Sequence, residues 1–317
     1  MSARARHLVA TYGTAVGGLL LFLGFALAAD NFLTPANLFT VLRQTSYLIV
    51  LGTGFTLALI AAELDLSFAS VASLAGVACG GLVHHEYPIV LAILAAVAVG
   101  AAFGGLNGFL VTVLRIPSLI ATLATASIAV GLAFMATNGV AWVGRWPKAF
   151  TGIGRGDLFG VPLLVVWSGL VTLVAYLLIA ETRFGVWLRA TGDADEATRL
   201  AGVPVKRMKR WGLFASGLCA GIAAVLLTAS LSSAGPDSAD GFLLTAIAAV
   251  LLGMTMFVPG KPNVFGTLVG CAIIGVLSNG LVLLGAPYYI QDIALGLIII
   301  ASVAISASVL TKAAFSI

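Results

Sequence analysis

The sequence predicts an all-α polytopic membrane protein with about ten transmembrane helices, arranged as two inverted-topology five-helix repeats. Apolar residues fill 61% of the 317 positions, whereas soluble domains reach about 45–50%. Charged residues make up only 9%, against about 25% in soluble domains, and this composition also argues against disorder or nucleic-acid binding. Charged and turn residues separate ten apolar runs, most of which are long enough to cross a bilayer.

The ten apolar runs define the predicted spans in chain order. They are 8–29, 38–62, 66–83, 88–114, 117–137, 162–180, 211–231, 242–258, 264–284 and 288–310. The third and eighth are at the short end of the spanning range. The first, which follows Arg4 and Arg6, is also typical of a cleaved signal peptide, but the nine runs after it favour a retained helix within one transmembrane domain, 1–317.

The basic residues predict cytoplasmic N- and C-termini. With that orientation, the inside segments hold twelve Lys and Arg residues and the outside segments hold four, as the positive-inside rule requires. Segment 138–161 is then an external loop. Its Trp142, Trp146 and Phe150 are candidates for docking a partner protein, although an interfacial aromatic belt explains them equally well.

The internal loop 181–210 concentrates eleven of the charged residues. Within it, 193–201 is predicted to be a short helix, with Asp193 as its N-cap and Glu196 completing a capping box. Gly202 supplies a left-handed stop, and Pro204 lies beyond it.

The predicted loop helix has an apolar face. This face consists of Ala194, Ala197, Leu200 and Ala201, with charged residues around the rest. A helix this short does not stand alone in water, so we expect it to dock on a partner. The alternative is a loop whose charges only fix the topology.

Two parts of the chain share a weak pattern. In each, a short apolar helix ends at a glycine, a Gly-rich span ends in Asn-Gly, and a proline turn leads to another span; the matching positions are Gly76 and Gly253, Asn107-Gly108 and Asn279-Gly280, and Pro117 and Pro287. Because five spans separate the copies, they cross the membrane in opposite directions. This pattern is typical of transporters with inverted repeats.

The membrane interior is polar but uncharged. No phosphate-binding G-x-x-x-x-G-K-[ST] loop is present, and the acidic residues lie at span ends, unlike those of ion-coupled transporters. The deep polar residues include Gln44, Thr45, Asn107, Ser278 and Asn279. Such groups suit a neutral polyhydroxyl solute, although helix–helix hydrogen bonding also explains most of them.

Three stretches resemble the membrane permease of ribose-type sugar ABC importers. The run ELDLSFAS at 63–70 is similar to the family's (G/E)-I-D-L-S-V-G-S. Asn107-Gly108 and the run IPSLIATLAT at 116–125 are similar to N-G followed by P-x-F-I-x-T-L-x-T. The most specific run, EATRLAGV at 196–203, is similar to E-A-A-R-L-S-G-I. The resemblance covers nearly the whole chain.

The resemblance implies a permease, not an enzyme, without a cofactor or metal, in a bacterial inner membrane. It implies a second permease, identical or different, two cytoplasmic ATPase subunits, and a periplasmic binding protein that delivers a simple sugar or related polyol. The loop helix would be the coupling helix, whose candidate ATPase contacts are Asp193, Asp195, Glu196, Ala197, Arg199, Leu200 and Gly202.

Six residues are candidates for the translocation path: Asp65, Ser67, Asn107, Thr122, Thr125 and Asn279. Capping and interhelical hydrogen bonds are the alternative interpretation of these residues. Other functions also stay open, namely a branched-chain amino-acid or nucleoside ABC permease and an ion-coupled secondary transporter. A membrane enzyme is disfavoured because no His, Asp or Ser cluster converges at one depth.

Overall fold

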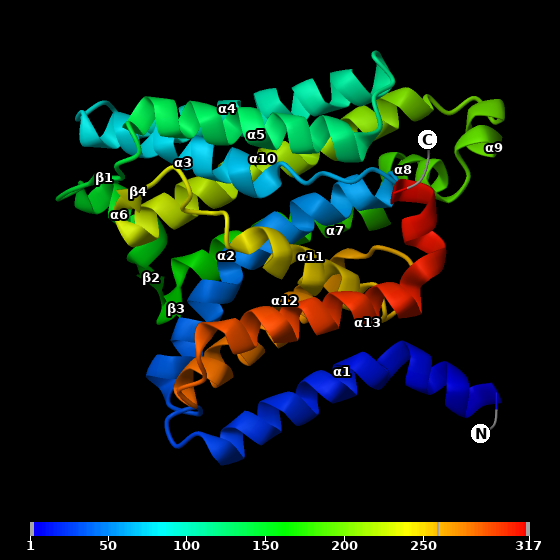
Figure 1. The fold of residues 1–317 in the computed structure, drawn as a ribbon, viewed down its shortest axis with the longest axis horizontal. Coiled ribbons are helices and arrows are strands. Elements are labelled where there is room, and N and C mark those ends of the chain that lie inside the picture. The colour runs from blue at the N-terminus through cyan, green and yellow to red at the C-terminus, as the bar shows by residue number, and fades with distance from the viewer. Residues whose placement is uncertain (1–2, 259, 315–317) are drawn as a thin grey trace.

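The computed structural model describes residues 3–258 and 260–314, so positions 1–2, 259 and 315–317 of the predicted domain lie outside it. Nearly all of the described chain is helical (Figure 1), which confirms the all-α class. The helices are α1 (Ala3–Ala28), α2 (Pro35–Ile60), α3 (Phe68–His84), α4 (Ile89–Thr112), α5 (Ser118–Thr137), α6 (Lys148–Arg155), α7 (Leu163–Ala180), α8 (Arg183–Asp193), α9 (Asp195–Leu200), α10 (Val205–Leu231), α11 (Phe242–Gly253), α12 (Val264–Leu283) and α13 (Tyr288–Ala314).

Four two-residue strands form two antiparallel pairs in the loops. β1 (Trp142–Val143) pairs with β4 (Ser233–Ala234), and β2 (Asp157–Leu158) pairs with β3 (Val161–Pro162). The first pair joins the loop after α5 to the loop after α10, and the second closes the turn before α7.

Each predicted apolar run has one helix of its own. Among the described residues, five helices are long and apolar enough to cross a membrane, namely α4, α5, α7, α10 and α12, and shorter apolar stretches lie in α1, α3, α11 and α13. Helix α2 has 26 residues, but Arg43 and Gln44 interrupt its apolar character. The positions of the ten helices agree with the sequence, and the number that cross the membrane stays a prediction.

Several helix boundaries differ from the predicted ones, and those of α10 and α11 have a local cause. Helix α10 begins at Val205, six residues before the predicted 211, because its charged first turns continue the helix out of the apolar run. Helix α11 ends at Gly253 instead of 258. Residues 254–258 form turns, and Phe257 adopts a φ of +60°, which is outside the helical region.

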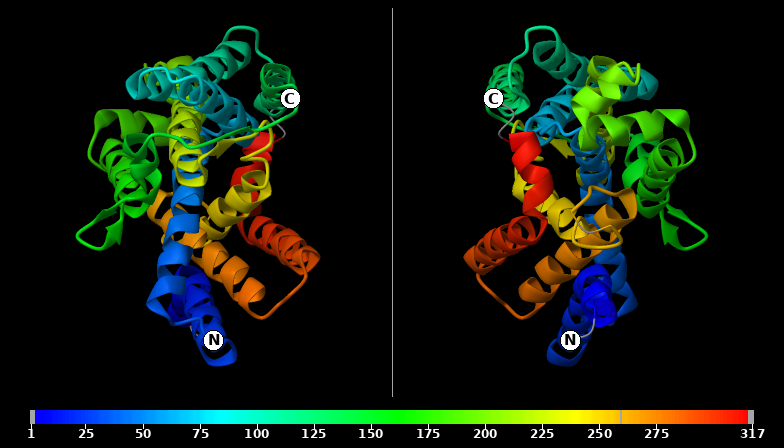
Figure 2. Two further views of the ribbon diagram at one scale, coloured as in Figure 1. Left: turned by 90° about the vertical axis from the view of Figure 1, so that its left-hand side faces the viewer. Right: turned by 90° about the vertical axis from the view of Figure 1, so that its right-hand side faces the viewer.

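Helices α2 and α10 lie at the centre of the bundle (Figure 2). Helix α10 packs against α4, α2 and α3, whereas α2 packs against α10, α12, α7 and α11. Two further sets match: α3 packs on α4 and α5, and α11 packs on α12 and α13. Helix α2 therefore contacts α11 and α12, in the same way as helix α10 contacts α3 and α4.

Glycines allow a close contact between α4 and α10. A Cβ atom on Gly100 would overlap the carbonyl oxygen of Gly217, and one on Gly217 would overlap that of Gly100. Gly104 and Gly221 are similarly crowded by the opposite backbone. Gly100 and Gly104, and Gly217 and Gly221, are each four residues apart and are therefore helix-packing positions.

The segment 138–161 folds onto the helices. Phe150 on α6 is fully buried, Trp146 is nearly so, and their ring centroids lie 5.7 Å apart. The expectation that these two rings dock a partner is therefore wrong, because the core already covers them. Trp142 packs against His84, with the ring centroids 5.0 Å apart.

Candidate functional site

The charged loop contains two helices, α8 and α9, and the predicted capping box is absent. Asp193 ends α8, and α9 begins at Asp195 after Ala194, which provides no side-chain cap. The carboxylate of Glu196 instead lies 3.0 Å from Arg199, one turn along. The predicted stop is confirmed, because Gly202 adopts a φ of +82°.

The apolar face of α9 is uncovered. Leu200 is 78% exposed, and Ala194, Ala197 and Ala201 are also exposed. Thr198 alone is buried on this helix, and its hydroxyl donates to the carbonyl oxygen of Ala190 at 2.7 Å. This hydrogen bond joins α9 to α8, and the apolar side chains of α9 stay exposed.

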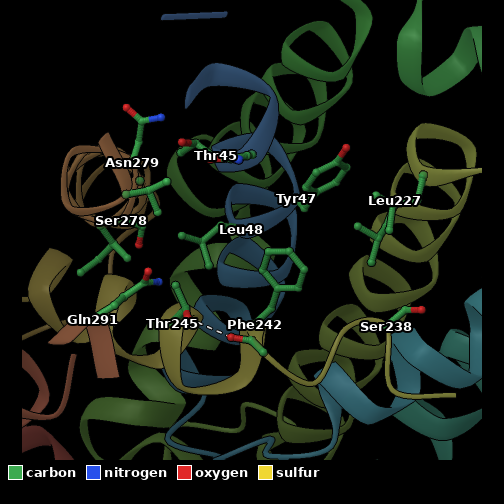
Figure 3. Close-up of a pocket in the computed structure, with 16 residues that line it drawn as sticks. Thr45, Tyr47, Leu48, Leu227, Ser238, Phe242, Thr245, Ser278, Asn279 and Gln291 are labelled. Carbon is green, nitrogen blue, oxygen red and sulfur yellow. Dashed lines mark hydrogen bonds between the residues drawn. The ribbon is translucent and has the colours of Figure 1, made fainter. Parts of the chain in front are cut away.

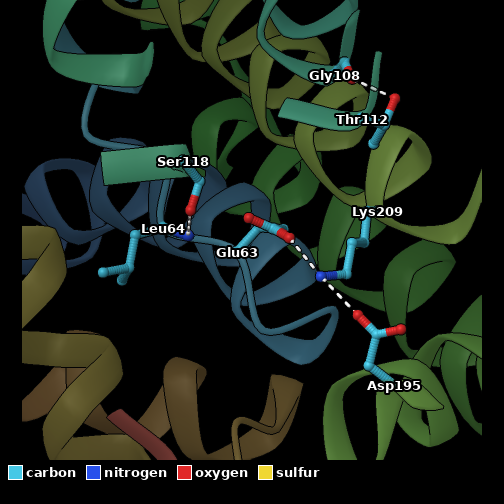
Figure 4. Close-up of polar contacts among 7 residues, drawn as sticks. All are labelled: Glu63, Leu64, Gly108, Thr112, Ser118, Asp195 and Lys209. Carbon is cyan, nitrogen blue, oxygen red and sulfur yellow. Dashed lines mark hydrogen bonds and ion pairs between the residues drawn. The ribbon is translucent and has the colours of Figure 1, made fainter. Parts of the chain in front are cut away.

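Two lysines fasten this loop to the bundle. The Nζ atom of Lys261, between α11 and α12, lies 2.7 and 2.8 Å from the two carboxylate oxygens of Asp193. The Nζ atom of Lys209 on α10 lies 3.0 Å from Asp195 and 3.0 Å from Glu63 (Figure 4). The start of α9 is therefore connected to both halves of the bundle.

Five of the six candidate path residues form one buried network around the non-helical segment 63–67. The hydroxyl and amide of Ser67 donate to Asp65 at 2.6 and 2.9 Å. The amide nitrogen of Asn107 donates to Ser67 at 2.8 Å, and the hydroxyl of Thr125 donates to the Asn107 carbonyl oxygen at 2.7 Å. Thr122 completes the network by accepting from the backbone N–H of Leu66 at 3.1 Å.

This network satisfies the backbone of an unwound segment. Irregular backbone at membrane depth persists only where protein covers it and supplies its hydrogen-bond partners. The hydroxyl of Ser118 accepts from the N–H of Leu64 at 3.2 Å, and Thr122 donates to the Leu64 carbonyl oxygen at 3.2 Å. The geometry therefore favours the structural interpretation of these five residues.

The sixth candidate, Asn279, lines a cavity of about 500 Å³ between α2, α10, α11, α12 and α13 (Figure 3). Its side chain exchanges two hydrogen bonds with Asn37, at 3.0 and 2.9 Å. Polar and aromatic side chains share the lining with leucines, and among the residues that the structure describes no Asp, Glu, Lys or Arg lines this cavity. Such a cavity offers hydrogen bonds to a neutral solute.

In the sequence, Gln44, Thr45 and Ser278 of this lining stand out only as deep polar residues. The other functional candidates of the lining do not stand out, namely Tyr47, Phe242, Thr245 and Gln291. Gln291 carried a usable signal, because an uncharged amide stands inside an apolar run. The two aromatic residues carried none, since rings are equally common in helix packing.

The chain is similar to several transport proteins. A family model described as "Branched-chain amino acid transport system / permease component" matches residues 37–303. The ribose import permease protein RbsC of Escherichia coli (strain K12) is 38% identical over 278 residues, 87% of this chain and 87% of that protein. The L-arabinose ABC transporter permease protein AraH of Azospirillum brasilense is 34% identical over 306 residues, 95% of this chain and 90% of that protein. The D-allose transport system permease protein AlsC of Escherichia coli (strain K12) is 32% identical over 281 residues, 88% of this chain and 86% of that protein.

Proposed function

The chain belongs to the branched-chain amino acid transport system permease-component family, and we propose that it forms the membrane path of an ABC importer for a simple sugar. It is a transport permease and not an enzyme. The relatives named for ribose, L-arabinose and D-allose support a sugar.

The neutral lining of the central cavity carries this proposal. A branched-chain amino acid brings an ammonium and a carboxylate, and each unpaired ion costs several kcal/mol to take out of water. The described lining contains no charged side chain to pair with either. A sugar needs only the donors and acceptors of uncharged side chains, such as the Gln and Ser of this lining.

The matching helix contacts of α2 to α5 and of α10 to α13 support two inverted five-helix repeats within ten spans. The start of α1 and the end of α13 lie at the same end of the bundle as α8 and α9 (Figure 1), which supports a shared cytoplasmic side. The central cavity then lies in the outer half, near the start of α2, α11 and α13 and the end of α12. This is the half that a sugar delivered from the periplasm reaches first.

The uncovered face of α9 supports its role as the coupling helix. ATPase subunits would seat Ala197 and Leu200 in a groove, with the Glu196 and Arg199 charges at its rim. Closure of two ATPases on ATP would draw the coupling helices of this chain and a second permease together. The ion pairs of Lys209 and Lys261 would couple this movement to the helical bundle. The bundle would then shift between outward- and inward-facing states.

A pull-down of the tagged chain from mild detergent tests the coupling role. The double variant Glu196→Lys/Arg199→Glu reverses both surface charges but retains their pairing, so the permease itself stays folded. We expect an ATPase to co-purify with the wild type and not with the variant. Equal recovery with both would reject the role of α9, and absence of an ATPase from both would contradict an ABC importer.

A further inference from the structure

The polar side chains of the central cavity differ in how far their hydrogen bonds are satisfied. Thr45 donates its hydroxyl to the carbonyl oxygen of Val41 at 2.6 Å, and Thr245 donates to that of Gly241 at 2.9 Å. Asn279 is engaged with Asn37. These side chains stabilise the walls: both threonine hydroxyl protons are used, and Asn279 has one of its two N–H donors engaged.

Three other side chains in the same lining have no partner. Within the described part of the chain, Gln44, Ser278 and Gln291 make no side-chain hydrogen bond. They come from three different helices, α2, α12 and α13. Each Gln offers two N–H donors and one acceptor, and the Ser hydroxyl offers both functions. Polar groups in membrane helices normally find partners within the protein, so three unpaired ones at one cavity point to a ligand.

Aromatic rings complete the cavity wall. Tyr47 and Phe242 are arranged edge to face, with their centroids 6.1 Å apart. Figure 3 shows Ser278 and Gln291 on the side of the cavity opposite Tyr47. The ring faces carry partial negative charge, which complements the C–H groups of a sugar ring, while the amides and hydroxyl meet its O–H groups.

Gln291 also lines a second cavity, of about 400 Å³, that contains Asp240 and Asp292. The two cavities share Gly241, Thr245 and Gln291. Gln291 therefore stands where an acidic compartment meets a neutral one. The carboxylates in the second compartment disfavour anionic solutes, and the central cavity, at about 500 Å³, is within the range of small-molecule sites.

We infer that the central cavity is a sugar-recognition chamber in which Gln44, Ser278 and Gln291 bind hydroxyl groups of a neutral pentose- or hexose-sized sugar. The permease then selects its solute a second time, after the binding protein. This inference rests on the proposed function, and it adds the residues that discriminate between sugars.

The test is uptake by the complete importer in proteoliposomes. The probe is whichever of D-ribose, L-arabinose and D-allose the wild type takes up fastest, compared with each of its singly deoxygenated analogues. Because the same binding protein delivers both sugars in every arm, a change in the ratio of uptake rates between variants comes from the permease. Each variant, Ser278→Ala or Gln291→Leu, loses a hydrogen bond to one hydroxyl of the sugar. For the analogue that lacks this hydroxyl, we expect the uptake rate of the parent sugar divided by that of the analogue to fall by about 5-fold, which is the value of one hydrogen bond.

Thr245→Val is the matched control, because it lines the same cavity with a hydroxyl that is already engaged. It should leave the ratio unchanged. If the uptake ratios for all singly deoxygenated sugars stay at the wild-type values in both Ser278→Ala and Gln291→Leu, the inferred sugar-recognition chamber is rejected. Gln44→Met, at an exposed position, replaces either variant that does not assemble. If the wild type takes up none of the three sugars, this result instead contradicts the proposed function.

Discussion

The ammonium group of Lys209 lies 3.0 Å from the carboxylate of Glu63 and 3.0 Å from that of Asp195. Glu63 begins the non-helical segment after α2, and its side chain is only 6% exposed. Asp195 begins α9, the helix with the uncovered apolar face. A single lysine thus connects the surface expected to meet the ATPase with the buried hydrogen-bond network around segment 63–67.

Removal of the lysine charge should destabilise the permease. Lys209→Met leaves Glu63 as a buried carboxylate without its partner, which costs about 3 kcal/mol. We expect a lower thermal unfolding midpoint in detergent and weaker binding-protein-stimulated ATP hydrolysis by the assembled importer.

The double variant Glu63→Leu/Lys209→Met separates stability from coupling. Replacing both partners of a buried ion pair with apolar residues is often neutral for stability, so the unfolding midpoint should recover. Stimulated ATP hydrolysis should stay low because the connection to Asp195 is still missing. Recovery of both properties would show that the pair only stabilises the fold.

Leu200→Asp should prevent assembly without unfolding the permease. The leucine is 78% exposed, so the substitution removes no core packing. We expect at least a tenfold loss of co-purifying ATPase with an unchanged unfolding midpoint. Leu158→Asp, at an exposed leucine on β2, is the control, and an equal loss with it would contradict a specific role for α9.

Asn107→Leu should destabilise the fold and leave sugar selectivity unchanged. It removes one hydrogen bond from Ser67 and one from Thr125, and each lost hydrogen bond costs about 0.5–1.5 kcal/mol. Thermal unfolding measures this loss against Ser127→Ala, which removes an exposed hydroxyl from α5. A change in the ratio of sugar uptake rates would instead support the prediction that Asn107 lies in the translocation path.

Gly217→Ala should lower the unfolding midpoint because the added methyl group overlaps the backbone of Gly100. Overpacking of this kind costs about 1–3 kcal/mol. Gly131→Ala is the matched control, since no atom lies within 4 Å of its added Cβ. Equal midpoints for the two variants would contradict the close crossing of α4 and α10.

The helices could be predicted from the sequence because hydrophobic runs, prolines and glycines act locally. Pro88, Pro117 and Pro162 each stand directly before a helix. Gly202 ends the charged loop helix as expected. Asp193 shows the limit of local reasoning: its spacing to Glu196 fits a capping box, but Lys261, far along the chain, pairs with it instead.

The sequence by itself determined the membrane class, the ten helices, the charged loop and the family, since each depends on composition or on neighbouring residues. The tertiary structure decided what the polar residues do. Asn107 and Asn279 each stand before a glycine near the end of a long helix, yet Asn107 is buried in a network with Ser67 and Asn279 lines a cavity beside Asn37. Their partners lie 40 and 242 residues away, and only packing of the helices brings such distant groups within hydrogen-bond range.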